Sequence, residues 1–343
     1  MRPRRAIAAM VAAGLLSLAG GAASAEPTVW GRARNPDDAS RRALIAEAQA
    51  LELKYHLYRS GRRDHLLDRQ AIQTLAEMYL VRALELFDLA GARRSRDPFV
   101  RLEVAEVLGL LGKHAEAVTV LESVVRADPP PVIAARAWVS LAVDYAHLSR
   151  VDEEIDAYTR ALAVQPLAPE RARILANRAE AYMLLGDITA AISGYRSALA
   201  LMTVDLFLSA RGSGVTTLWG LAVALDRSGD LDGGIDAVRV ARSYDREDKQ
   251  LSGPGWFYVP EYDRHWYAAL GHWAVARHGD LGSVRVNAYA LAVGELDEFI
   301  SRAARDDKWL PLARARRQQC ERERAAYLRR EARPAATSER PKR

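Results

Sequence analysis

The stretch that decides the fold is ILANRAEAYMLLGDITAAISGYRSAL, at residues 174–199. Its small and apolar residues recur three or four positions apart on either side of a Gly186-Asp187 turn, a spacing that places each set on one helical face. The first set is Leu175, Ala179 and Tyr182, and the second is Ala191, Ile192, Tyr195, Ala198 and Leu199. The stretch therefore predicts two short amphipathic helices that pack against each other. Because such a pair leaves one side uncovered, it needs neighbours of the same kind.

Three further segments align with this stretch on the turn. The small residue of the first helix is Ala105, Ala142, Ala179 and Ala222; the turn residue is Gly112, Ser149, Gly186 and Gly229; the bulky residue of the second helix is Leu121, Tyr158, Tyr195 and Val238. Small residues let the two helices of a pair approach closely, and bulky residues fill the gap to the next pair. The repetition predicts an all-α stack with four helix pairs over residues 98–248.

This pattern resembles the tetratricopeptide repeat family. The resemblance covers residues 98–248, with a weaker fifth unit beginning near His265, and it departs from the family pattern at Glu154 and Gly234, where a small Ala is usual. It implies a right-handed α-solenoid whose first helices line a concave, partner-binding groove. Atypical capping helices are expected at 37–97 and within 265–331, because the ends of a repeat stack need polar outer faces. Within these caps the sequence predicts helices at 66–89, 287–305 and 309–331.

The N-terminus has the three parts of a secretory signal. Arginines among the first five residues precede an apolar run at 6–19, and Ala23-Ser24-Ala25 supplies a small-residue cleavage site. Residues 1–25 are therefore predicted to be a cleavable signal peptide, which implies a periplasmic or secreted protein. The alternative is a retained N-terminal membrane anchor. No later stretch reaches transmembrane length; residues 26–36 are expected to be a linker, and the polar tail at 332–343 to be disordered.

The chain is not basic throughout, although its net charge is +5. Residues 302–343 hold 14 Lys/Arg against 6 Asp/Glu, so the body before them is mildly acidic. This charge asymmetry predicts a basic end, and nucleic acid is not an expected partner. Two interpretations of that end stand side by side: a solvated face of a capping helix, or a surface for anionic head groups or an acidic partner.

The sequence holds no motif for catalysis, metal or cofactor binding. Walker, HExxH, CxxC and GxSxG patterns do not occur, and the alternating aspartates at 226–232 have Leu231 where a calcium loop needs Gly. The single cysteine, Cys320, cannot form an intramolecular disulfide and lies on an apolar stripe, which favours a core residue over a reactive thiol. The sequence therefore predicts a non-catalytic scaffold without a cofactor or metal.

The helical register assigns a set of side chains to the concave side of the stack. These are Arg136, Val143, Arg173, Asn177, Glu180, Trp219, Trp266 and Trp273. We expect them to bind a protein or peptide that carries an apolar or aromatic anchor. The alternative is that the three tryptophans pack against the following helix. Asn177 matches a residue with which some family members grip a C-terminal carboxylate, but the basic residues that complete that clamp are missing.

A segment rich in glycine, proline and aromatic residues interrupts the repeats at 249–264. Its prolines and glycines predict an extended chain through Pro260, with helix resuming near Tyr262. Trp256 and Tyr258 are expected to be covered, either as a seal between two repeats or as one wall of the binding groove. The alternative function is an envelope-associated enzyme or polymer-binding protein that uses residues 253–267, with Glu261 and Asp263 as its acidic pair.

Overall fold

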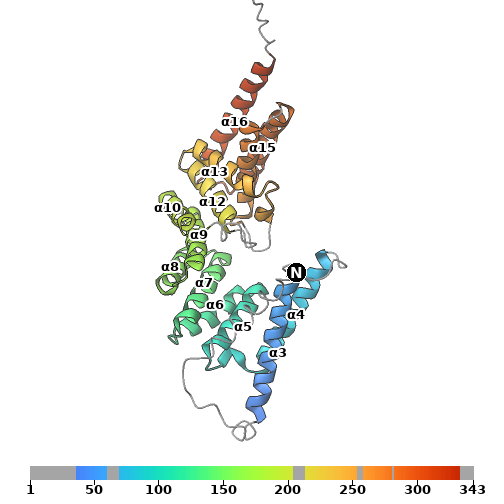
Figure 1. Ribbon diagram of the computed structural model, residues 1–343, viewed down its shortest axis with the longest axis vertical. Coiled ribbons are helices and arrows are strands. Elements are labelled where there is room, and N and C mark those ends of the chain that lie inside the picture. Colours follow the sequence, from blue (N-terminus) through green and yellow to red (C-terminus); the bar gives the residue numbers. More distant parts are fainter. Residues whose placement is uncertain (1–35, 60–68, 204–212, 253–257, 280–281, 333–343) are drawn as a thin grey trace, which may run out of the picture.

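The computed structural model describes residues 36–59, 69–203, 213–252, 258–279 and 282–332. These residues form thirteen α-helices and three short 3-10 helices, and the described ranges contain no strand (Figure 1). The predicted all-α solenoid of helix pairs is confirmed. The predicted signal peptide, the linker up to residue 35, and the tail beyond residue 332 lie outside the described residues.

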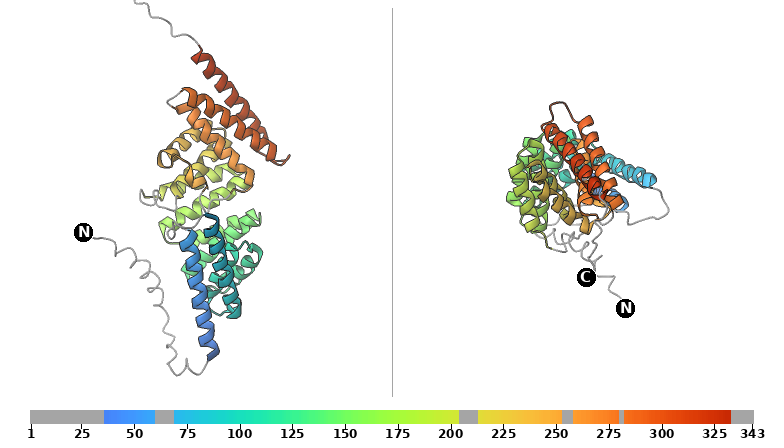
Figure 2. Two further views of the ribbon diagram at one scale, coloured as in Figure 1. Left: turned by 90° about the vertical axis from the view of Figure 1, so that its right-hand side faces the viewer. Right: turned by 90° about the horizontal axis from the view of Figure 1, so that it is seen from above.

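The helices follow one another in antiparallel pairs along the long axis of the molecule (Figures 1 and 2). The pairs are α3 (Pro36–Arg59) with α4 (Arg69–Leu89), α5 (Pro98–Leu110) with α6 (His114–Val125), α7 (Pro131–His147) with α8 (Val151–Val164), α9 (Ala168–Leu185) with α10 (Ile188–Ala200), α12 (Ser213–Arg227) with α13 (Leu231–Tyr244), and α14 (Arg264–His278) with α15 (Gly282–Arg302). A last helix, α16 (Leu310–Glu331), covers α15.

The turns within the pairs confirm the sequence alignment. The four aligned turn residues all have a positive φ, from 57° at Ser149 to 101° at Gly229. Three of the four are glycine, the residue that adopts this left-handed conformation without steric cost. After Gly186, the Asp187 side chain accepts a hydrogen bond from the Ala190 amide at 3.0 Å and caps α10. The turn therefore ends one helix and begins the next.

The small residues allow close helix crossings, as the repeat pattern predicts. A Cβ built on Gly194 of α10 would lie 2.9 Å from the Cβ of Ala179 on α9. A Cβ on Gly220 of α12 would lie 2.5 Å from the ring of Tyr195 on α10. Larger side chains at these positions would push the helices apart.

The first helices of the units form the inner side of the curved stack. They contact one another across neighbouring units, α5 with α7, α9 with α12, and α12 with α14, and no comparable contact joins the second helices of the described units. We call the side formed by α5, α7, α9, α12 and α14 the inner face. The buried apolar residues make two clusters, one ending at Ile174 and the other beginning at Ala179, so the two cores meet within α9.

The capping helices differ slightly from their predicted bounds. Helix α4 begins at Arg69 and α16 at Leu310, close to expectation, whereas α15 begins at Gly282, five residues before the predicted Asn287. Helix α16 buries Leu310, Ala313 and Cys320 against the stack. In the described part of the chain, no helix has the length and apolar character needed to cross a membrane.

Candidate functional site

The N-terminal part of the inner face carries charged side chains that remain accessible. Arg136 of α7 reaches back to α5, where its Nε donates to Glu106 Oε1 at 2.7 Å and its Nη2 to Glu103 Oε1 at 3.3 Å. The Arg136 side chain is nevertheless 42% exposed. Ser140, one turn further along α7, donates to the same Glu106 carboxylate. This network joins the first two units and still presents a cation to solvent.

Acidic groups outnumber the cation in this network. Burial raises the pKa of Glu103 to about 7, and the nearby negative charge of Glu52 on α3 adds to the increase while Arg136 opposes it. Burial also raises the pKa of Glu106. The carboxyl of Glu103 therefore changes its charge near neutral pH, so the charge of this part of the face depends on pH.

The next part of the inner face lies on α9. Arg173 bonds to Glu170 one turn earlier at 2.8 Å and is 42% exposed. Asn177 donates from Nδ2 to the Tyr158 hydroxyl at 3.3 Å, and Val143 on the preceding first helix is half-buried. Four predicted site residues, Arg136 and Val143 on α7 and Arg173 and Asn177 on α9, therefore lie on two consecutive units with part of each side chain accessible. We call α5, α7 and α9 up to Asn177 the open part of the inner face.

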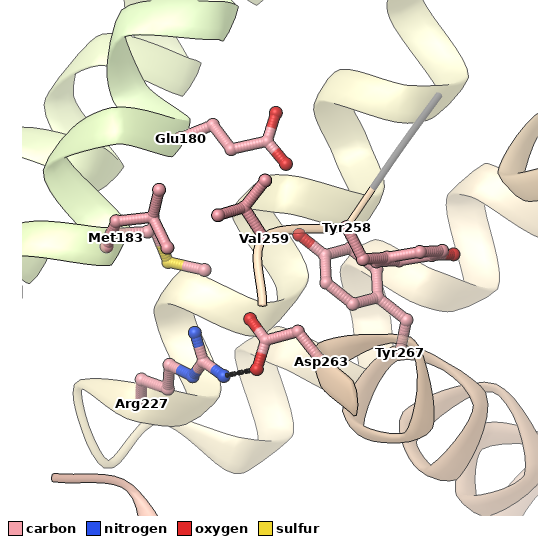
Figure 3. A pocket seen from close by; sticks show the side chains of 8 residues that line it. Glu180, Met183, Arg227, Tyr258, Val259, Asp263 and Tyr267 are labelled. Atoms are coloured by element: carbon pink, nitrogen blue, oxygen red, sulfur yellow. Dashed lines mark hydrogen bonds and ion pairs between the residues drawn. The ribbon is translucent and has the colours of Figure 1, made fainter. Parts of the chain in front are cut away.

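Glu180 lies where the accessible surface ends, beside a small cavity (Figure 3). The cavity is lined by Glu180, Met183, Leu184, Arg227, Tyr258, Val259, Asp263 and Tyr267. Its volume of about 10 Å³ is the space of a single water molecule and far below that of a small-molecule site. Burial raises the pKa of Glu180 to about 8, with the charge of Asp263 adding to the increase. The raised pKa favours the neutral carboxyl of Glu180 and so weakens it as a charged contact for a ligand.

The interrupting segment helps to cover this region. The Tyr258 hydroxyl donates to the Leu251 carbonyl at 3.3 Å, and its ring packs edge-on against Tyr267, with the centroids 5.3 Å apart. Val259 lies between Glu180 and Tyr258 in the cavity wall (Figure 3). These contacts agree with the seal that the sequence offered as one alternative for Tyr258. Trp256 lies outside the described residues.

The predicted acidic pair of the alternative enzyme does not flank a shared pocket. Asp263 accepts a hydrogen bond from Arg227 Nη2 at 2.7 Å, and both side chains are nearly buried (Figure 3). The Glu261 side chain is 82% exposed and pairs with Arg264 at 3.1 Å. Two carboxyl groups in such different environments, with only a one-water cavity beside Asp263, do not form the paired acid and base of a hydrolase.

Three of the predicted groove residues are instead part of the core. Trp219, Trp266 and Trp273 are 0%, 1% and 1% exposed, which corrects the prediction that they line an accessible groove. Each of the three indoles contacts a helix that comes later in the chain. Trp219 lies against Gly271 of α14, Trp266 packs on Phe299 of α15 at a centroid distance of 5.0 Å, and Trp273 donates to Glu323 of α16 at 2.8 Å. The packing alternative is the correct one for these side chains.

A buried polar network that the sequence did not reveal holds α12, α14 and α16 together. Arg227 lies 4.8 Å from the ring centroids of both Trp266 and Trp309, in cation–π range of each. Asp226 accepts from Trp266 Nε1 at 2.9 Å and from Arg316 Nε at 2.6 Å. The sequence signal at this place was a charged Asp226-Arg227 pair at the end of an apolar helix, and Asp226 was considered only as part of the alternating aspartates.

The remaining candidate sites have structural roles. Asp230 caps α13 by accepting from the Gly233 amide at 2.9 Å, and Asp232 pairs with Arg277. No group of three or more potential metal ligands occurs in the described ranges. Cys320 is fully buried, and burial raises the pKa of its thiol to about 12. It is the core residue that its position on the apolar stripe predicts.

The basic end is partly neutralised by ion pairs within the protein. Arg316 pairs with Asp226, and Arg317 pairs with Asp297 and Glu321. These arginines anchor α16 to the stack. The expected surface for anionic groups at this end stays a prediction; four of its fourteen Lys/Arg lie beyond residue 332 and outside the described residues.

The fold and the accessible inner face define a helical-repeat solenoid built from helix–turn–helix units. Among solved structures, the chain is similar to a tetratricopeptide repeat protein from Parabacteroides merdae, with 15% identity and a TM-score of 0.45 over 80% of this chain and 98% of that one. It is also similar to the TPR2AB domain of yeast Sti1 in its complex with pHSP90, with 14% identity and a TM-score of 0.26 over 83% of this chain and 98% of that one. No family model and no curated protein matches the chain.

Proposed function

We propose that this protein is a non-catalytic scaffold of the cell envelope that holds a polypeptide partner against the open part of the inner face. One observation carries the proposal. Arg136 on α7 and Arg173 and Asn177 on α9 stay accessible on the same side of two consecutive first helices, while the equivalent side of the later units is buried. A surface of guanidinium, amide and small apolar groups repeated along a stack suits an extended chain better than a compact small molecule.

The proposed location rests on the order of residues 1–25, in which a basic start, an apolar run and Ala23-Ser24-Ala25 follow one another. Export would place the scaffold in the periplasm or outside the cell. Sequencing of the mature N-terminus should give Glu26 or an adjacent residue. A cytoplasmic protein that retains Met1 would contradict the location and leave the partner-binding proposal to be judged separately.

The partner-binding proposal is tested by capture from an envelope extract followed by reconstitution with the purified partner. The test variant is Arg136→Ala combined with Arg173→Ala, which removes both accessible guanidinium groups from the inner face. The control is Arg160→Ala on α8, whose side chain is 57% exposed and pairs with Asp156 on its own helix. Arg160 belongs to a second helix and so lies away from the inner face.

We expect the wild type and Arg160→Ala to bind the partner with the same Kd, and the double variant to bind on the order of tenfold more weakly or worse. Circular dichroism of all three proteins checks that the fold is unchanged. Equal binding by the double variant would contradict the proposed surface. Hydrolysis or modification of the captured partner by the purified protein would contradict the non-catalytic assignment.

A further inference from the structure

A second surface, on the other side of the α12–α13 pair, has the shape and charge of a binding site. It is a depression of about 540 Å³ between α13 and α14 that is open to solvent. Its lining is Arg239, Arg242, Ser243, Arg246, Ala274, Val275, His278 and Gly279. The lining contains three guanidinium groups and one imidazole, and no carboxylate.

The three arginines come from one sequence pattern. Arg239, Arg242 and Arg246 are spaced i, i+3 and i+7, which places them along one side of α13 and its C-terminal end. The two helical arginines are about 4.5 Å apart along the helix axis, and Arg246 continues the row. The side chains therefore form a row of positive charge, not one convergent cluster.

The nearby acidic groups neutralise this row only in part. Arg239 pairs with Asp236 at 3.4 Å, but the two side chains are 59% and 63% exposed, so the pair is weak. Arg242 pairs with Asp248 at 3.1 Å. Among the described residues, no carboxylate lies within ion-pair distance of the exposed Arg246 or of His278. The depression therefore keeps a net positive charge at neutral pH.

The middle of the row is held in place by the protein. Arg242 Nη1 donates to the Gly271 carbonyl of α14 at 2.8 Å, in addition to the ion pair with Asp248. A guanidinium fixed in this way loses little side-chain entropy when a ligand binds. Below it, Ala274, Val275 and Gly279 form a floor without charge. The floor can accept the backbone and small side chains of a ligand while the rim binds its anionic groups.

We propose that this depression binds an acidic polypeptide segment, with glutamate or aspartate carboxylates spaced along an extended chain. A guanidinium pairs with a carboxylate through two parallel hydrogen bonds, which gives such a row both affinity and direction. A single phosphate would require the arginines to converge, and Arg242 is held away from convergence by Gly271 and Asp248. A flat lipid surface would not fill a hollow of this volume. The proposal is independent of the open part of the inner face, because its residues lie on α13 and at the end of α14 and not on α5, α7 or α9.

The test measures binding of a short fluorescent peptide in which Glu alternates with Ser, using the full mature chain and fluorescence anisotropy. The test variant is Arg239→Gln combined with Arg246→Gln. The matched control is Arg196→Gln, because Arg196 directly follows Tyr195 in α10 as Arg239 directly follows Val238 in α13. Arg196 and Arg239 are both exposed, so neither change should affect the fold.

We expect the wild type and Arg196→Gln to bind the peptide equally at low ionic strength, and the double variant to bind on the order of tenfold more weakly. Affinity should fall as salt is raised from roughly 0.05 M to 0.5 M. A peptide with Gln in place of Glu should not bind. Separate arms add inorganic phosphate as a competitor and offer vesicles of phosphatidylglycerol.

Several results would overturn the proposal. They are no binding of the Glu peptide at low salt, equal binding by the double variant, and equal binding of the Gln peptide. Competition by phosphate at the same concentration as the peptide would identify a single-anion site instead. Binding of vesicles without binding of the peptide would identify a membrane surface. None of these results bears on Arg136 and Arg173, so failure here is distinguishable from failure of the proposed scaffold function.

Discussion

Arg136 and Trp266 were both assigned to the inner face of the stack, but the Arg136 side chain is 42% exposed and Trp266 is 1% exposed. The difference is in what lies above them. Arg136 contacts side chains of the neighbouring helix α5, namely the carboxylates of Glu103 and Glu106 and the ring of Phe99. Trp266 is covered by Phe299 of α15 and by the guanidinium of Arg227, and its indole N–H donates a hydrogen bond to Asp226.

The inner face therefore has an open part and a closed part. The open part spans α5, α7 and α9 up to Asn177. The closed part spans α12 and α14, where residues 258–263, α15 and α16 supply the cover. The comparison teaches that the helix-pair repeat fixes which way a side chain points, whereas elements outside the repeat decide whether a partner can reach it.

The largest expected loss of stability comes from removing a buried side chain from the closed part of the inner face. Trp266→Ala should lower the free energy of unfolding by about 3–5 kcal/mol, because it removes a fully buried indole and leaves Asp226 without one of its donors. Trp138→Ala on α7 provides the comparison with an indole that is only partly covered. Trp138 is only half-buried under Arg160, so that change should cost about 1–2 kcal/mol.

Chemical denaturation with urea measures both variants. If Trp138→Ala and Trp266→Ala lose the same stability, Trp266 is no better covered than the half-buried Trp138, and the closed part of the inner face is not closed in solution. The unfolding slope with denaturant should stay the same in both variants, since neither changes the surface exposed by the whole chain.

A smaller effect depends on pH and arises where the two apolar cores meet at α8 and α9. Burial raises the pKa of Glu154 to about 8, and the charge of Glu180 adds to the increase. The pKa of Glu180 is also raised by burial, to about 8. A carboxyl whose folded-state pKa exceeds its unfolded value stabilises the fold below the unfolded pKa and loses that contribution as pH rises through the folded pKa. Stability should therefore decline between pH 4.5 and about 8.

Replacing both groups, Glu154→Gln with Glu180→Gln, should remove this part of the pH dependence. Above pH 8 the double variant should be more stable than the wild type by on the order of 2 kcal/mol. Thermal melts across the pH range measure it. The control is Glu153→Gln, since Glu153 is 46% exposed beside Arg150 and its pKa is lowered. A wild-type protein whose stability rises through this pH range would show that the carboxyls at the junction are not buried in solution.

The sequence predicted the repeat because its signals are local. A small residue such as Ala179, a left-handed turn at Gly186 and a cap at Asp187 act within one pair of helices, and all three do in the structure what their spacing indicates. The same alignment identified Glu154 as a departure from the usual small residue. It could not predict that the side chain would be buried, with an oxygen that none of the described residues bonds.

The candidate site was predicted only in part because cover depends on contacts far apart in the sequence. Arg316 reaches Asp226 across 90 residues, and Trp273 reaches Glu323 across 50. The spacing of apolar residues within one helix pair cannot predict contacts between residues so far apart in the sequence. Arg136, Arg173 and Asn177 keep part of their side chains accessible, and their role in binding stays a prediction, whereas the three tryptophans are buried.

A third prediction concerns the ion pairs of the open part. Arg136→Met keeps the aliphatic stem and removes the charge, which leaves Glu103 and Glu106 facing each other. The loss of stability should be about 1 kcal/mol above pH 7. It should shrink at lower pH, because Glu103, with a pKa of about 7, takes up a proton and no longer needs the cation. Melting curves at several pH values measure the difference; Arg160→Met, on an exposed pair, should change stability little at any pH.

The smallest expected change in stability is that of Arg173→Gln, a variant that should weaken partner binding while leaving the fold intact. Arg173→Gln removes a guanidinium that is 42% exposed and that, among the described residues, forms an ion pair only with Glu170 on its own helix. The free energy of unfolding should therefore stay within about 0.5 kcal/mol of wild type. If the open part of the inner face holds a partner, the same change should weaken binding severalfold, because the guanidinium is then desolvated against the partner. Urea denaturation and partner titration on one preparation give both numbers. A variant that loses stability but not binding would make Arg173 a structural residue, and the contrast between the open and closed parts would no longer mark a binding surface.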